Sequence, residues 1–272
     1  MQLENYFISQ FKSRRIGDDG ALIGNTVYSK DAFFENVHFK TSWMSHYQIA
    51  RKAMLVNVSD AIAMNAKPKY ALLSVAMPKS ITKGQMRELV DGFESVADEF
   101  DFEIIGGDTI SNSKLDITIT VISHVKKALL RKNIKNGYHL AYTGKLGDSK
   151  KDLQKLLNLG SVHSKSKFLA MKLRQKFIEK SSRFLKAGMD ISDGLFSDLE
   201  KLTTLNKIGV RFDSKISKAI GCSGEEYEML VAFDKRDRKK ILRHAKLTRT
   251  KLNIFAHVSR CKYTNRCKAH HF

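Results

Sequence analysis

A chain of 272 residues, 42% of them hydrophobic, is long enough to fold as two domains of ordinary size. Its formal net charge of +20 would attract any polyanion, whether nucleic acid, a membrane surface or nucleotide phosphates. No apolar stretch approaches the roughly 20 residues that cross a bilayer, and the lysines are scattered rather than gathered in one arm, so composition excludes a membrane-spanning protein and does not favour specific nucleic-acid binding.

Helical and extended patterns alternate through the first half of the chain. Helical spacing of apolar residues predicts helices over residues 44–65 and 80–100. Extended patterns predict strands over residues 69–78, 102–107 and 115–125, and in the last of these the apolar residues alternate along one face. This alternation is typical of an α/β or α+β sheet domain.

A basic stretch over residues 126–137 interrupts this pattern, and we place a domain boundary within it. We therefore expect one domain of residues 1–130 and a second of residues 131–272. The second half repeats the mixture, with strands expected at "HLAYTG", "GVRFD" and "LNIFAHV", and helices after "LGDS", after "SDG" and over residues 236–247. The predicted fold class is therefore α/β (α+β), built from two mixed α/β domains.

The cysteines and the N-terminal segment bear on the compartment. "MQLENYFISQFKSRR" has no basic segment followed by an apolar one, so we expect a cytoplasmic protein. Cys222, Cys261 and Cys267 are an odd number of cysteines, which favours reduced thiols over a disulfide framework. Cys261, Cys267, His270 and His271 do not have the usual spacing of zinc ligands, and a polar C-terminal end is the simpler interpretation.

Asp60 lies on the predicted buried stripe of the helix over residues 44–65. Helical spacing places it beside Ala53, Asn57 and Met64. Because burial of an isolated carboxylate is costly, such a residue is usually paired, protonated or bound to a cation. No arginine lies in its own turns, so a metal ion and a tertiary salt bridge are both open explanations.

Further acidic residues occur at predicted strand ends or turns, near glycine or small hydroxyl residues. Carboxylate oxygens are the ligands that Mg²⁺ prefers. Any one of these residues also suits a helix cap or an Asx turn, and for "SDG" capping is the favoured interpretation. Taken together, acidic turns from both halves predict a site that holds several Mg²⁺ ions against a phosphate chain. The residues are Asp18, Asp19, Asp31, Asp108, Asp190 and Asp193.

No P-loop and no protein-kinase catalytic loop occurs. The ordered set "IGDDGAL", "KDAFFENVHF", "NVSDAIAMNAKP", "IIGGDT", "TGKLGDS", "MDISDGL" and "SGEEYEML" resembles the thiamine-monophosphate kinase family, within the superfamily that includes aminoimidazole ribonucleotide synthetase. The resemblance runs from residue 16 to about residue 230. It implies a homodimer in which the two N-terminal sheets form a barrel, with a C-terminal sheet flanked by helices. It also implies transfer of the ATP γ-phosphoryl group to the phosphate of thiamine monophosphate, with Mg²⁺.

The resemblance implies roles for individual residues, of which Asp60 and Asp193 are expected to be catalytic. Expected magnesium ligands are Asp19, Ser29, Asp31, Asp60, Asp108, Asp190 and Asp193. Expected ATP-binding residues are Gly107, Asp108, Arg131 and Ser192. His38 and Glu225 are expected near the thiamine substrate, although His38 alone would be interpreted as a hydrogen-bonded core histidine.

Two positions depart from the family pattern. Lys30 stands where the family usually has a hydroxyl residue, and would either replace part of a metal's charge or point away. Ala269 stands where an aromatic residue normally covers the thiamine. The competing interpretations are another ATP-dependent synthetase of the same superfamily, or a basic nucleic-acid-binding protein whose binding would depend on salt.

Overall fold

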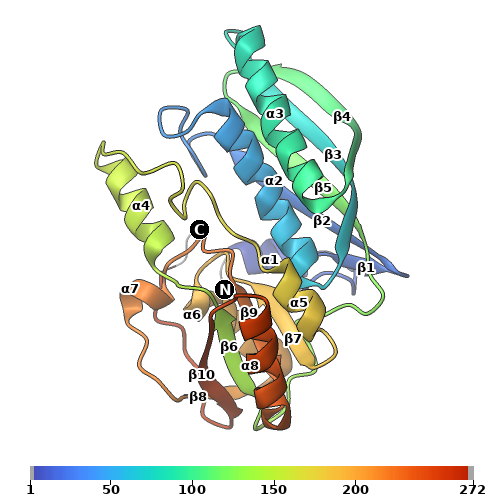
Figure 1. Ribbon diagram of the computed structural model, residues 1–272, viewed down its shortest axis with the longest axis vertical. Helices are drawn as coiled ribbons and strands as arrows, with labels where there is room; N and C mark the ends of the chain where they lie inside the picture. The colour runs from blue at the N-terminus through green and yellow to red at the C-terminus, as the bar shows by residue number, and fades with distance from the viewer. Residues whose placement is uncertain (1–2, 269–272) are drawn as a thin grey trace.

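The computed structural model describes residues 3–268 and contains two five-stranded sheets (Figure 1). In the first sheet the strand order is β1-β2-β5-β3-β4. Its neighbours are antiparallel except for β3 and β4, which are parallel. The strands are β1 (Ala21–Ile23), β2 (Thr26–Phe34), β3 (Lys67–Pro78), β4 (Glu103–Asn112) and β5 (Asp116–His124).

Helices α2 (His46–Ala63) and α3 (Lys83–Phe100) lie on the same side of the first sheet, whose other face carries no helix among the described residues (Figure 1). A short helix α1 (Leu3–Ser9) precedes the sheet. The strands of this sheet alternate buried and less buried positions: in β5 the side chains of Ile117, Ile119 and Val121 are buried toward the helices. One face therefore forms the core, as the alternating pattern predicts.

The second sheet has the order β7-β9-β6-β10-β8, and all its neighbours are antiparallel. Its strands are β6 (His139–Thr143), β7 (Leu185–Asp190), β8 (Gly209–Phe212), β9 (Met229–Phe233) and β10 (Leu252–Ser259). The helices of this half are α4 (Asp148–Leu157), α5 (Gln175–Ser181), α6 (Leu195–Asn206), α7 (Lys218–Gly221) and α8 (Arg238–Leu247), with a 3₁₀ turn η1 (Lys235–Asp237). Two mixed α/β sheets flanked by helices confirm the predicted fold class.

Helix α2 lies between the two halves. It begins with a capping box in which Ser45 and Gln48 satisfy each other's backbone N–H groups. Thirteen of its 18 residues are buried, which is expected of a helix that is apolar all round rather than on one face. Its core residues belong to the same apolar cluster as Met229 and Val231 of the second sheet. Polar side chains on the surface of α2 that faces the second sheet, such as Ser59, are therefore placed between the halves.

Two of the sequence-based expectations for the first sheet need correction, and one open alternative is decided. Asp31 and Asp108 lie within β2 and β4 rather than at strand ends or turns. Lys30 lies on the open face of β2, where its Nζ donates to Thr118 Oγ1 at 3.3 Å, so it points away from Asp31. Ala269 lies outside the described residues, as do His270 and His271.

The expected reduced thiols are also wrong for two of the three cysteines. Cys222 and Cys267 form a disulfide with a Cα–Cα distance of 5.5 Å, and Cys261 is free and exposed. The odd number of cysteines could not show that the fold brings two residues 45 positions apart within bonding distance. With Cys267 paired, the described residues do not support a zinc site there. Among the described helices, none is both long and apolar enough to cross a membrane.

Candidate active site

Four carboxylates from distant parts of the sequence meet beside helix α2. Asp19 precedes β1, Asp31 lies in β2, Asp60 is in the last turn of α2, and Asp190 ends β7. One carboxylate oxygen from each of Asp19, Asp60 and Asp190 lies within 4.8 Å of the other two. Asp31 joins them because its carboxyl group interacts electrostatically with that of Asp60. These four residues, which we call the acidic cluster, are all among the expected magnesium ligands.

Polar residues of α2 orient the acidic cluster. Asn57 Oδ1 accepts a hydrogen bond from the backbone N–H of Asp31 at 2.9 Å, and Ser59 Oγ donates to Asp190 Oδ2 at 2.7 Å. Ser29 is buried on β2, and its Oγ donates to the carbonyl oxygen of Asn57 at 3.4 Å. Ser29 therefore lies beside the cluster, with its hydroxyl hydrogen directed to α2.

Arg131 connects the cluster to the segment that follows β5. Its guanidinium forms an ion pair with Asp19 Oδ1, and its backbone N–H donates to Asp18 Oδ1 at 2.8 Å. The two adjacent carboxylates of "GDDG" thus have different partners. The Asp19 side chain is only 1% exposed, and its second oxygen, Oδ2, is buried without a hydrogen-bond partner in the described part of the chain.

Burial and mutual repulsion favour the protonated forms of these carboxyl groups. Burial raises the pKa of Asp31 to about 6. Burial, followed by the charges of Asp31 and Asp190, raises the pKa of Asp60 well above its ordinary value, and burial with the charge of Asp19 does the same for Asp190. Burial also raises the pKa of Asp19, against the opposing effect of Arg131. One guanidinium is too little charge to compensate four carboxylates.

This donor set suits a hard divalent cation. Its closely spaced groups are carboxylate oxygens, and one of them, Asp19 Oδ2, is buried and unpartnered among the described residues. Mg²⁺ prefers oxygen ligands and commonly takes only one or two carboxylates, keeping several waters. A bound cation would also supply the positive charge that the cluster lacks. The residues therefore fit magnesium.

A second acidic group adjoins the cluster at the start of α6. Lys201 Nζ donates to Asp193 Oδ2 at 2.6 Å and to Asp198 Oδ1 at 2.9 Å. Asp198 is fully buried, and its Oδ2 accepts from the backbone N–H of Asp193 at 3.1 Å. The expected capping role of "SDG" is wrong, because the N-cap is Gly194 and it makes no side-chain cap bond. Asp193 instead contacts the lysine one turn further along.

His38 and Glu225 are linked through a buried lysine and an aromatic ring. The His38 ring stacks on Phe33 with centroids 5.5 Å apart. Lys52 Nζ lies 5.7 Å from the Phe33 centroid and 2.6 Å from Glu225 Oε2. His38 Nδ1 accepts from the backbone N–H of Phe34 at 3.0 Å, which agrees with a hydrogen-bonded histidine.

Gly107 and Asp108 lie away from the acidic cluster. Across β2, β5, β3 and β4, Asp31 is in register with Ile119, Leu73 and Gly107, so its Cα is about 14 Å from that of Gly107 at the usual strand spacing. Asp108 is exposed on the open face of the sheet. A Cβ on Gly107, whose φ is +154°, would lie 1.7 Å from the Leu73 carbonyl oxygen. The close packing against Leu73 is therefore sufficient reason for a glycine at position 107. Within one chain, Asp108 does not reach the acidic cluster.

Lys52, Asp198 and Lys201 are polar residues of the site that the sequence patterns do not predict. Lys52 stands immediately before the apolar run "AMLV" of α2, and a charge beside such a run is the signal that points to it. Asp198 and Lys201 resemble the solvated charges of an ordinary helix face. Only the fold shows that both contact Asp193.

The comparisons with known proteins agree with this geometry. Residues 17–125 match the family described as AIR synthase related protein, N-terminal domain. The thiamine-monophosphate kinase of Buchnera aphidicola subsp. Schizaphis graminum is 31% identical over 264 residues, which cover 83% of this chain and 78% of that protein. The Bacillus subtilis enzyme of the same name is 32% identical over 212 residues, covering 72% of this chain and 65% of that protein. The matched region thus spans slightly less than two thirds of the Bacillus enzyme.

Solved structures share the fold over nearly the whole chain. The thiamine monophosphate kinase from Aquifex aeolicus superposes with a TM-score of 0.83 at 21% identity, covering 96% of this chain and 93% of that one. AaThiL complexed with AMPPCP and TMP superposes with a TM-score of 0.84 at 21% identity, covering 98% and 91%. From the identity and coverage of its sequence relatives, the chain belongs to the thiamine-monophosphate kinase family.

Proposed function

We propose that this protein transfers the γ-phosphoryl group of ATP to the phosphate of thiamine monophosphate, producing thiamine diphosphate and ADP. The observation that carries the proposal is the acidic cluster, which gathers carboxylates of both sheets at a lysine- and arginine-bearing junction. The family membership names the substrates. The AaThiL complex, which holds AMPPCP and TMP, has the same fold.

The chemistry requires positioning and charge neutralisation rather than a strong base. The acceptor is already an anionic phosphate oxygen, so no hydroxyl proton has to be removed before attack on the γ-phosphorus. Bound Mg²⁺ would reduce the repulsion between the two phosphate groups. The chain's own part is to hold the ligand oxygens rigidly, which Asn57 and Ser59 do by fixing Asp31 and Asp190.

Within this proposal the expected residues divide into groups. Asp60 and Asp193 would be the catalytic carboxylates, and Ser29 with Asp19, Asp31 and Asp190 would complete the metal-binding side. Arg131 and Ser192 lie at the junction and would contact the triphosphate, for which Arg131 has a guanidinium Nε that is buried and unpartnered among the described residues. His38 and Glu225 would contact the acceptor, because Phe33 and Lys52 connect them on one side of α2.

We also propose a homodimer formed through the open face of the first sheet, with residues 1–130 as the dimerising domain and 131–272 as the second. Support comes from large apolar side chains left on this face, namely Tyr28, Tyr70, Leu72 and Ile110, which are 38–59% exposed. An open apolar sheet face of this kind is a common protein interface. Gly107 and Asp108 would then be at the interface, where Asp108 could join an ATP site. The cytoplasm, where ATP is available, is the proposed compartment.

A product assay tests the proposed reaction. Purified protein is incubated with ATP, Mg²⁺ and thiamine monophosphate, and the thiamine esters and nucleotides are separated by chromatography. We expect thiamine diphosphate and ADP in equal amounts, and almost no product when EDTA replaces Mg²⁺. Free thiamine should be a poor acceptor, because its hydroxyl needs a base that the site does not provide. Efficient conversion of free thiamine with release of AMP would contradict the proposal.

A further inference from the structure

Lys52 is completely buried in the middle of helix α2. Its Nζ lies 2.6 Å from Glu225 Oε2 and 3.4 Å from the centroid of the Phe168 ring. The Phe33 ring is also near, at 5.7 Å. Burial of an ammonium is strongly unfavourable unless the charge is compensated, and here one carboxylate and the faces of two aromatic rings compensate it. Burial lowers the pKa of Lys52, against the opposing effect of Glu225.

Glu225 is held in a constrained turn at the edge of the site. Its side chain is 25% exposed, so Oε2 faces the buried lysine while part of the carboxylate remains accessible. Its backbone N–H donates to the Ser192 carbonyl oxygen at 2.7 Å. Both Glu225 and Tyr227 have positive φ, of 53° and 47°, a region that is unfavourable for a residue with a side chain. The turn therefore needs partners that hold it in place.

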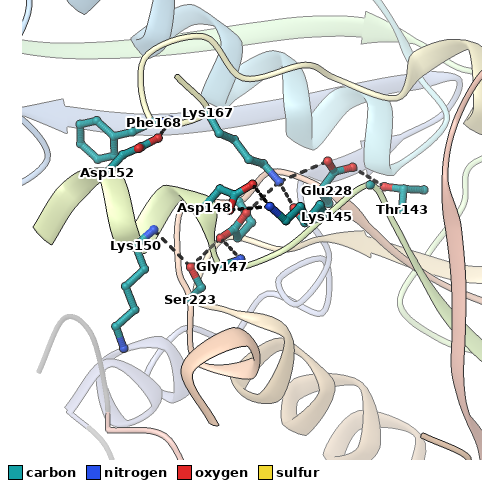
Figure 2. A network of polar contacts seen from close by, with 12 residues as sticks. Thr143, Lys145, Gly147, Asp148, Lys150, Asp152, Lys167, Phe168, Ser223 and Glu228 are labelled. Carbon is teal, nitrogen blue, oxygen red and sulfur yellow. Dashed lines mark hydrogen bonds and ion pairs between the residues drawn. The ribbon is translucent and has the colours of Figure 1, made fainter. Parts of the chain in front are cut away.

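The neighbouring residues of this turn are anchored from the other side. Lys167 Nζ lies 2.7 Å from Glu226 Oε2 and 3.2 Å from Glu228 Oε1, and Figure 2 shows its side chain reaching from the overlying segment toward Glu228. Arg174 binds both oxygens of Glu228 at 2.7 Å. These cations hold the pKa of Glu228 below its ordinary value although burial alone would raise it. Lys167 thus binds Glu226 and Glu228, the acidic residues that follow Glu225 in the sequence.

Phe168 connects the ion pairs of Lys167 with the buried ammonium of Lys52. Phe168 follows Lys167 directly in the sequence, is only 1% exposed, and lies over the Lys52 ammonium. It also packs edge-on against Trp43, with ring centroids 6.4 Å apart. Four separate parts of the chain therefore meet at one ammonium group: strand β2, helix α2, the turn at Glu225, and the segment between α4 and α5.

We infer, on the basis of the proposed function, that Lys52 is a positioning residue for the acceptor. Its ammonium, held between the buried rings of Phe33 and Phe168, fixes the Glu225 carboxylate, and the partly exposed Glu225 side chain contacts the ring system of thiamine monophosphate. The thiazolium ring of the acceptor is a cation, and an uncompensated ammonium at this place would repel it. Paired with Glu225, the lysine adds no net charge, and the accessible part of the carboxylate can accept a hydrogen bond from the amino group of the pyrimidine.

The inference is tested with Lys52→Met, Glu225→Gln and the double variant. Methionine replaces the buried stem with an unbranched apolar side chain of similar length, and glutamine keeps the shape of a partly exposed glutamate. We expect Lys52→Met to raise KM for thiamine monophosphate at least tenfold, with KM for ATP unchanged and kcat altered less than threefold. In the Glu225→Gln background the same replacement should change KM less than twofold, because its partner is already lost.

Lys67→Met is the matched control. It removes an exposed ion pair in which Lys67 Nζ lies 3.0 Å from Asp101 Oδ2, with side chains 46% and 82% exposed, and it should leave all constants unchanged. Additive effects of the two replacements, or equal changes in KM for ATP, would show a structural role and overturn the inference. If Lys52→Met does not fold, the inference rests on Glu225→Gln, which must raise KM for thiamine monophosphate alone or overturn it. A wild-type chain that does not bind thiamine monophosphate in calorimetry overturns the proposed function as well.

Discussion

Replacing Asp60 with asparagine should stabilise the metal-free protein and abolish most of its activity. Asp60 has ligand oxygens of Asp19 and Asp190 within 4.8 Å. Two unit charges at this distance repel each other by about 3 kcal/mol at an effective dielectric constant of 20. Because raised pKa values show that protonation already relieves part of this repulsion, we expect Asp60→Asn to gain about 1–3 kcal/mol at pH 7. For a chain of this size that corresponds to an increase in Tm of roughly 2–8 °C.

The assay compares thermal unfolding in EDTA and in Mg²⁺ with turnover of thiamine monophosphate. Wild-type protein should gain about 3 kcal/mol when free Mg²⁺ is roughly 100 times Kd, whereas the variant should gain much less and turn over at least about 100-fold more slowly. The control is Asp98→Asn, which neutralises an exposed carboxylate of α3 and should change neither quantity. A lower Tm in EDTA together with normal turnover would refute the reasoning, because Asp60 would then be a structural partner and not a ligand.

Three further predictions concern stability. Burial raises the pKa of Asp198 to about 6, so the folded state keeps a proton that the unfolded state releases. The stability of Asp198→Asn relative to wild type should therefore rise by about 2 kcal/mol between pH 4 and pH 7, measured by urea unfolding in EDTA, and a flat difference would contradict the shift. Gly107→Ala should lower Tm far more than Gly106→Ala, because the new Cβ meets backbone at 1.7 Å in the first case and only a Leu72 methyl at 3.9 Å in the second. Reduction of the Cys222–Cys267 bond, which spans 45 residues, should destabilise the chain by up to about 4 kcal/mol, and equal unfolding with and without dithiothreitol would show that the bond is not formed.

The elements with strong periodicity could be predicted from sequence. The helices expected over residues 44–65 and 80–100 occur as α2 and α3, and the strands expected over 69–78 and 115–125 occur as β3 and β5. In contrast, β2 and β9 were not predicted. The strand β2 contains Ser29, Lys30 and Asp31, which read as a polar turn, and β9 is buried at every position and has no alternation to detect.

The candidate site could also be predicted from sequence only in part. The residue types of the acidic cluster indicate metal binding, and the buried stripe predicted for Asp60 led to its place between the two halves. Spacing cannot show which carboxylates converge, because that depends on tertiary packing. Asp190 reaches the cluster through a hydrogen bond from Ser59 on α2, whereas Asp108 remains exposed on the open face of β4. Lys52 was missed because its partner, Glu225, is 173 positions away.

The positive net charge of the chain and its buried carboxylates have different roles, since the first attracts anionic substrates and the second would bind a cation. Anionic substrates approach a chain of net charge +20 favourably from every direction, yet the point of reaction is lined by carboxylates that would repel phosphate without a cation. The cost of holding Asp19, Asp31, Asp60 and Asp190 together in the folded protein is therefore also the source of metal affinity, since a bound cation relieves the repulsion that folding creates. Removal of one carboxylate should improve folding and weaken metal binding together, and an evolved cluster of this kind is kept for function at the expense of stability.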